Sequence, residues 1–175
     1  MFKIVDMSNI KIKRALISVT DKKNIEQLAS QLKSFDIEII STGGTAKHLK
    51  KNSIKVTKVE DITKFPEILD GRVKTLHPKI YGGILSRKNL KKDQDILKTF
   101  DIPSIELVIV NLYKFTDTIK KSKPTNKIVE SIDIGGPSLI RATAKNYKYT
   151  TIVTDPKDYN TLISQIKENG STKTD

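Results

Sequence analysis

Residues 105–112 read IELVIVNL, the most hydrophobic run in the chain, and this stretch decides the fold. A strand buried on both faces of a parallel sheet is a continuous apolar run rather than an alternating one. We therefore predict a central strand here. The run is far shorter than the roughly 20 apolar residues of a membrane-spanning helix, and no other run approaches that length.

Outward from this strand, apolar runs alternate with amphipathic segments. Residues 14–19 (RALISV) predict a strand, and apolar positions at helical spacing predict a helix from Asp21 to about Phe35. Further expectations are a strand over 38–40, a helix over 45–51, an extended segment over 56–60, a strand over 150–153 and a helix from Asp155-Pro156 to about Gly170. The alternation predicts an α/β fold, a doubly wound and mainly parallel sheet with helices on both faces.

The composition indicates one globular domain. A chain of 175 residues with 37% hydrophobic and 30% charged residues buries a substantial core and leaves little room for a second domain. The N-terminal stretch MFKIVDMSNIKIKR lacks the apolar core of a secretory signal, and the chain has no cysteine. We expect a cytoplasmic protein.

The formal net charge of +12 has the sign typical of nucleic-acid-binding proteins. Only four basic residues are arginines, however, and the lysines are spread along the chain without a basic amphipathic helix or an aromatic stacking motif. We expect neither a nucleic-acid nor a membrane partner. The positive field would help to attract anionic nucleotides.

Polar residues follow the first two predicted strands, where doubly wound sheets bind their ligands. Hydroxyls, glycines and a helix start suit a phosphate group, because they offer donors and close backbone approach. These residues also suit an ordinary turn or helix cap, so each motif alone leaves both interpretations open. The candidates are Ser18, Thr20 and Lys22 after the first strand and Thr42, Gly43, Gly44 and Thr45 after the second.

The segment 70–85 (DGRVKTLHPKIYGGIL) does not fit a helix or strand period and is interpreted as a binding loop. In an extended segment Arg72 and Lys74 share one face, which suits a phosphate or a developing oxyanion. The alternative is a surface loop with solvated cations. His77 precedes a proline, and a structural role is at least as well supported for it as an acid or base role.

Residues 131–146 place Asp133 before another glycine pair, Gly135 and Gly136, whose backbone N–H groups are expected to face a ligand. An Asp before glycine is usually a turn former. If Lys145 reaches the same partly dry pocket, the two side chains form a candidate acid and base pair, with Tyr113 nearby.

Four motifs in one order, STGGTA, DGRVKTLHP, NLYKF and IDIGGPSLIRATAKN, closely resemble the cyclohydrolase domain of the bifunctional purine-biosynthesis enzyme. The resemblance covers roughly residues 13–170 and implies a methylglyoxal-synthase-like fold. It implies an N-terminal extension over 1–12 and a domain over 13–175 that is shortened relative to the family and lacks the formyltransferase domain.

The resemblance implies ring closure of 5-formamidoimidazole-4-carboxamide ribonucleotide to inosine monophosphate, without a metal or cofactor. 10-Formyltetrahydrofolate serves only the absent formyltransferase (AICAR formyltransferase) domain. Lys74 would polarise the formyl oxygen, Asp133 would accept or orient the amide proton, and Lys145 with Tyr113 would handle the departing oxygen, although base and acid could be exchanged. The phosphate-site residues named above, with Arg72 and Thr75, would hold the substrate.

Two other functions fit the same fold. Phosphate-sensing regulatory domains share it, and so does methylglyoxal synthase. The motif IDIGGP with Lys145 favours an enzyme over a sensor, and the segment GRVKTLHP favours the cyclohydrolase. The family also implies a homodimer in the full-length enzyme.

Overall fold

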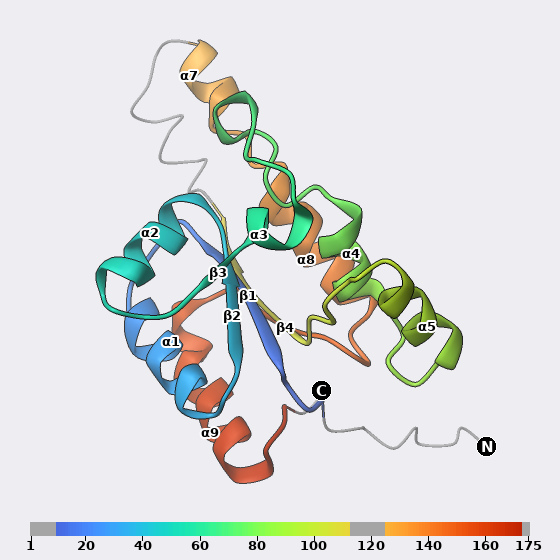
Figure 1. The fold of residues 1–175 in the computed structure, drawn as a ribbon. Coiled ribbons are helices and arrows are strands. Elements are labelled where there is room, and N and C mark those ends of the chain that lie inside the picture. The colour runs from blue at the N-terminus through green and yellow to red at the C-terminus, as the bar shows by residue number, and fades with distance from the viewer. Residues whose placement is uncertain (1–9, 113–124, 173–175) are drawn as a thin grey trace, which may run out of the picture.

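The computed structural model describes residues 10–112 and 125–172. These residues form a five-stranded, all-parallel sheet in the order β3-β2-β1-β4-β5 with helices on both faces, as predicted (Figure 1). In chain order the elements are β1 (Arg14–Val19), α1 (Ile25–Ser34), β2 (Glu38–Ser41), α2 (Gly43–Lys51), β3 (Thr57–Lys58), α3 (Val59–Thr63), η1 (Leu69–Gly71), α4 (Pro78–Leu85), α5 (Lys91–Thr99), β4 (Leu107–Asn111), α7 (Thr125–Glu130), α8 (Gly135–Lys145), β5 (Thr151–Val153), η2 (Pro156–Asp158) and α9 (Tyr159–Asn169).

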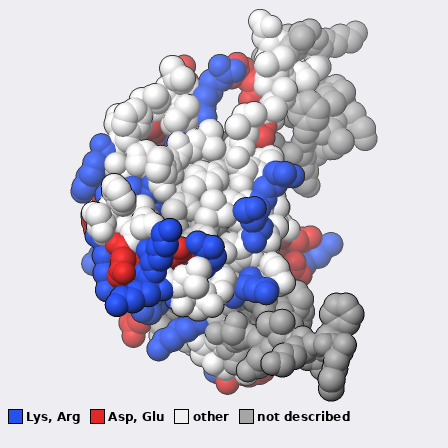
Figure 2. Space-filling model, turned by 90° about the vertical axis from the view of Figure 1, so that its right-hand side faces the viewer, with Lys and Arg blue, Asp and Glu red and all other residues white. Residues whose placement is uncertain are grey.

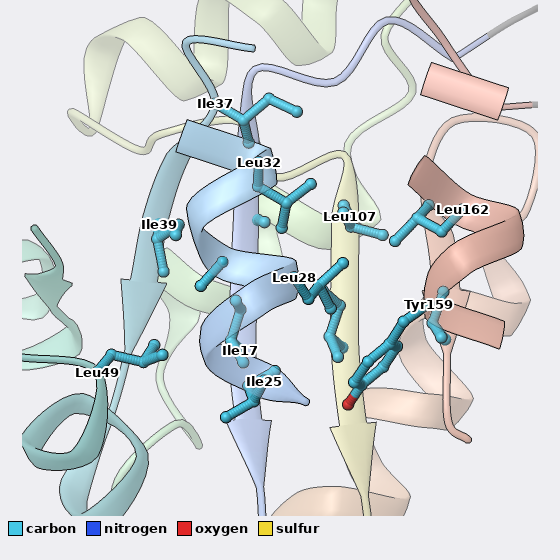
Figure 3. Packing of buried hydrophobic residues seen from close by; sticks show 14 of the residues in the cluster. Ile17, Ile25, Leu28, Leu32, Ile37, Ile39, Leu49, Leu107, Tyr159 and Leu162 are labelled. Atoms are coloured by element: carbon cyan, nitrogen blue, oxygen red, sulfur yellow. The ribbon is translucent and has the colours of Figure 1, made fainter. Parts of the chain in front are cut away.

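Successive residues of the central strands enter two separate cores, because side chains alternate between the faces of a sheet. Ile17 of β1 and Leu107 of β4 pack under α1, α2 and α9, as Figure 3 shows. Leu16 and Val108, their immediate neighbours in the chain, pack under α4 and α8. The strand over 105–112 is thus central and buried on both faces, as its continuous apolar run indicates.

Three predicted elements differ from the structure. The segment 56–60 is extended only over Thr57–Lys58, and α3 begins at Val59, which is buried. A carboxylate oxygen of Asp61 accepts the backbone N–H of Lys58 at 3.2 Å and closes the first turn of α3. Helix α2 begins at Gly43 rather than at residue 45, so both glycines belong to its first turn.

The third difference concerns the predicted loop over 70–85, because its second half is helix α4. His77 begins this helix, and its Nδ1 accepts the backbone N–H of Lys79 at 3.1 Å. Pro78 occupies the first helical position, where its missing N–H leaves no bond unmade. The structural interpretation of His77 therefore agrees with this geometry.

Both ends of the described chain meet at the amino ends of the strands. Ile10 and Thr172 form an antiparallel bridge, and the backbone N–H of each donates to the carbonyl oxygen of the other. Ile10 and Ile12 are buried, so the packed part of the chain includes residues assigned to the extension. Among the described residues, no helix has the length and apolar character needed to cross a membrane.

Candidate functional site

A cleft of about 730 Å³ opens at the carboxyl ends of β1 and β4. The strand order reverses direction between these two strands, and open parallel sheets bind ligands at such a switch point. The volume lies in the range of about 300–1,000 Å³ that is usual for small-molecule sites. Predicted site residues that line the cleft are Ser18, Thr20, Lys22, Thr42, Gly44, Thr45, Arg72, Lys74, Thr75, Asp133, Gly135 and Gly136.

The loop after β1 is held by Asn111, the last residue of β4. Its Oδ1 accepts the backbone N–H groups of Thr20 and Asp21 at 2.7 and 2.9 Å, and its Nδ2 donates to the carbonyl oxygen of Asp21 at 2.9 Å. Asn111 thereby fixes the loop that carries Thr20 and Lys22 into the cleft. Sequence analysis gave it no role in the site, although a polar residue at the end of a buried strand is a usable signal.

The N-terminus of α2 forms a second wall. Thr42 is extended and directly precedes the helix, which has no acidic side chain in its first turn. Thr45 is buried, and its hydroxyl accepts from the backbone N–H of Val19 and donates to the carbonyl oxygen of the same residue. The Thr45 hydroxyl therefore joins α2 to β1 and has no proton left for a phosphate. Gly43 lines an adjoining cleft of about 580 Å³ instead of the main one.

The third wall is the segment around η1, which carries the two predicted cations. Arg72 donates from Nη2 to Glu130 of α7 at 3.2 Å, and both side chains are exposed. Lys74 lies on the wall between the two clefts, with its Nζ 3.4 Å from a carboxylate oxygen of Glu67. Thr75 is buried beneath them. Sequence analysis did not single out either acidic partner.

The fourth wall is the N-terminus of α8, where Asp133 precedes the glycine pair. The Oδ1 atom of Asp133 accepts the backbone N–H of Gly136 at 2.8 Å. A β-carbon on Gly136 would lie 2.5 Å from Leu112 Cδ2 and 2.7 Å from Asp133 Oδ2, so this position has no room for a side chain. Both interpretations of Asp133 are thus present: it holds the turn, and it lines the cleft.

Exposed apolar side chains complete the lining, and they were not predicted. Hydrophobic residues on the surface are common singly, but a group of them beside a cleft indicates a ligand-binding or partner-binding surface. Three of them, Leu76, Ile132 and Ile134, lie outside the helices and strands, and the other two lie in the short elements η1 and α7, so sequence periodicity gives little signal for them. They are Leu69, Leu76, Val129, Ile132 and Ile134.

The charges of the cleft are mixed. Lys22, Arg72 and Lys74 supply the positive side chains, and Asp70, Glu130 and Asp133 supply the negative ones. The N-terminus of α2 adds free N–H groups with positive partial charge, which favours an anion. At the start of α8 the N–H of Gly136 already donates to the Asp133 carboxylate and Pro137 has no N–H, so the expectation that the Gly136 N–H faces a ligand does not hold here. Within residues 10–112 and 125–172, no group of three or more His, Cys, Asp or Glu side chains is arranged to hold a metal ion.

The structure does not bring Asp133 and Lys145 together in the cleft of one chain. Lys145 is the last residue of α8, whereas Gly135 is the first, and ten residues of helix span about 15 Å. The Lys145 side chain is exposed and absent from the cleft lining. Tyr113 lies outside the described residues.

Lysine and arginine side chains are dispersed over the face that α4, α5 and α8 cover (Figure 2). Acidic and uncharged residues lie among them on this face. A spread of this kind is typical of a solvated surface. The net charge alone therefore does not mark the cleft as a binding site. Its basic residues are distinguished by the polar and acidic side chains that line the cleft with them.

Residues 24–138 match the MGS-like domain family. A bifunctional purine biosynthesis protein PurH from Caldicellulosiruptor bescii is 54% identical over 90% of this chain, and one from Listeria welshimeri is 51% identical over 92%. The chain spans about a third of the length of these relatives, 31% and 32%. A solved structure described as the crystal structure of ForH is 32% identical, with a TM-score of 0.79 over 92% of this chain and 83% of that one.

Proposed function

The chain belongs to the MGS-like domain family, and we propose that it is the part of a bifunctional purine-biosynthesis enzyme that acts as an IMP cyclohydrolase. The observation that carries the proposal is one cleft that joins two helix N-termini, the cations Arg72 and Lys74, the carboxylate of Asp133 and an apolar rim. The substrate would be 5-formamidoimidazole-4-carboxamide ribonucleotide.

The composition of the cleft supports a nucleotide ligand, because a nucleotide has one strongly anionic group and one flat apolar ring. The backbone N–H groups at the start of α2, which has no acidic side chain in its first turn, suit the 5′-phosphate. Lys22 adds a positive charge beside the loop that Asn111 holds. Exposed side chains such as Ile132 and Ile134 suit the heterocycle.

The reaction needs no redox step and no external nucleophile. The carboxamide nitrogen attacks the formyl carbon, a C–N bond forms, and the carbonyl electrons move to the formyl oxygen. That oxygen receives one proton from the carboxamide nitrogen and one from the formamide nitrogen. The C–O bond then breaks, water leaves, and a C=N bond forms between the former formyl carbon and the formamide nitrogen, which completes the six-membered ring. A catalyst must therefore align the two groups, stabilise negative charge on one oxygen and move two protons.

Two side chains of the cleft suit these tasks. The ammonium of Lys74 has three donors, so it can keep its contact with Glu67 and still donate to the formyl oxygen. Asp133 already accepts one N–H, and the remaining acceptor positions of its carboxylate can take the proton of the carboxamide. We propose Lys74 as the group that stabilises the oxyanion and Asp133 as the base, with no cofactor.

Lys145 needs a different arrangement, because it ends α8 and does not line the cleft of its own chain. If Lys145 takes part, it acts on the cleft of a second copy. We therefore propose that this chain forms a homodimer, as the family resemblance implies for the full-length enzyme. Such a dimer would bring the C-terminus of α8 of one copy to the α8 N-terminus of the other.

The test follows conversion of the formylated carboxamide ribonucleotide to inosine monophosphate by ultraviolet absorbance. The purified chain is compared with Lys74→Met, Asp133→Asn and the control Lys167→Met, an exposed lysine on α9. We expect turnover in the parent and control and a loss of about 100-fold or more in the other two, with inosine monophosphate still bound.

A second arm offers dihydroxyacetone phosphate and measures methylglyoxal. Turnover that survives unchanged in both Lys74→Met and Asp133→Asn would remove the assigned roles. Formation of methylglyoxal without ring closure would replace the proposed function with a lyase. A folded parent chain that binds nucleotide but converts neither substrate would also contradict a self-sufficient cyclohydrolase.

A further inference from the structure

The ammonium of Lys74 and the carboxylate of Glu67 meet between two glycines. A β-carbon on Gly71 would lie 2.5 Å from Glu67 Oε1 and 2.9 Å from Lys74 Nζ, closer than side chains approach one another. A β-carbon on Gly43, at the start of α2, would lie 3.3 Å from the same Nζ. Both glycines have a positive φ, +86° at Gly71 and +45° at Gly43, which other residues rarely adopt. The ion pair therefore occupies the space that a side chain at residue 71 would fill.

A tight turn brings the two partners together. Ile68 and Val73 form an antiparallel bridge, and Glu67 and Lys74 are the next residues outward on the two arms. Between the arms, Leu69, Asp70 and Gly71 follow one another in the left-handed region, with φ of 54°, 52° and 86°. Successive left-handed residues are disfavoured for L side chains and persist where the surroundings hold them, which occurs most often at functional sites.

We propose that Glu67 is a positioning residue for Lys74, a role that rests on the proposed function of Lys74 in ring closure. Glu67 holds the ammonium on the wall of the cleft, and Gly71 leaves the room for it. A free lysine side chain has many rotamers and loses this freedom when it meets a ligand. A lysine side chain that an ion pair already holds loses little conformational entropy when the substrate binds. The remaining N–H donors of its ammonium are therefore already positioned for the substrate oxygen.

A purely structural ion pair would have different consequences. The two side chains are 35% and 29% exposed, and partly exposed pairs contribute little to folding stability. A structural role therefore predicts a slightly less stable chain with an unchanged reaction. A positioning role predicts that removal of the Glu67 charge changes the chemical reactivity of Lys74 and lowers the rate of the reaction step.

The first arm of the test measures Lys74 without any turnover. Folded protein is acetylated briefly with acetic anhydride, and the modified fraction of Lys74 relative to the exposed Lys167 of α9 is read by mass spectrometry. We expect Glu67→Gln, which keeps the shape and removes the charge, to raise this ratio several-fold. The matched control is Asp101→Asn, which removes the partner 3.5 Å from Lys79 and leaves Lys74 alone.

The second arm measures ring closure by the same variants. We expect Glu67→Gln to lower kcat by about 10- to 100-fold, because small displacements of a reacting group have effects of this size. KM and the affinity for inosine monophosphate should change less than about twofold, since Lys74 acts mainly after binding. Glu67→Asp retains the charge and should recover part of kcat.

The two arms separate the possible failures. An unchanged modification of Lys74 in Glu67→Gln overturns the positioning role whatever the turnover. A raised modification with an unchanged kcat in an active chain overturns it as well. If the parent chain performs no ring closure, the proposed function fails, and the acetylation ratio still decides whether Glu67 holds Lys74.

Discussion

The loop between β1 and α1 gives the most direct test of how the fold prepares the cleft. Asn111 makes three hydrogen bonds to this loop, at 2.7, 2.9 and 2.9 Å, and Asn111→Ala removes all of them. The bonds are exposed, so each contributes near the low end of the usual range, about 0.5 kcal/mol. The total of about 1.5 kcal/mol corresponds to roughly tenfold in an equilibrium constant.

We expect this free energy to appear in ligand affinity, because the freed loop carries Thr20 and Lys22 away from the proposed phosphate site. Calorimetric titration with inosine monophosphate should show about tenfold weaker binding in Asn111→Ala. The matched control is Asn52→Ala, which removes one exposed bond to the carbonyl oxygen of His48 at the far end of α2. A dissociation constant within about twofold of the parent, in a variant with an unchanged circular dichroism spectrum, would refute the reasoning.

Three further predictions concern other parts of the molecule. A β-carbon on Gly83 would lie 2.3 Å from the carbonyl oxygen of Pro103, so Gly83→Ala should cost about 1–3 kcal/mol and lower Tm by about 3–10 °C in calorimetry. Burial lowers the pKa of Lys88 to about 8 while the unfolded value stays about 10.4, so between these pH values only the unfolded chain keeps the proton. The free energy of unfolding should therefore rise with pH in that window, and urea titrations of Lys88→Met should lack this rise. If Lys145 acts on the cleft of a second copy, an equal mixture of Lys145→Met and Asp133→Asn should recover about a quarter of parent turnover, and no recovery would exclude such sharing.

Much of the fold was predictable because burial on a sheet leaves a clear pattern. The strand β1 has the predicted bounds, and the apolar run over 105–112 contains β4. The segment 56–60 was predicted less well, because extended and helical forms of a short β-branched segment differ little until packing chooses between them. The burial of Val59 and the bond from Asp61 favour the helix there.

The candidate site was predictable to the extent that it follows strand ends. Parallel strands end at one edge, so polar residues after β1, β2 and β4 had to gather there. The partners of the cations were not predictable in this way. Glu67 reaches Lys74 through a left-handed turn, and Glu130 reaches Arg72 across 58 residues of chain. Neither ion pair has the regular spacing in the sequence from which a contact within a helix or strand can be predicted.

The sequence by itself determined the layers of this protein and the edge at which its polar loops collect, since these depend on local pattern and on which residues are polar. The tertiary structure alone decided which charges meet. It placed Lys74 beside Glu67 between two glycines, and it separated Asp133 from Lys145 by the length of α8. The physical reason is that an ion pair depends on distances of a few ångströms, and the path of the backbone between two residues sets those distances.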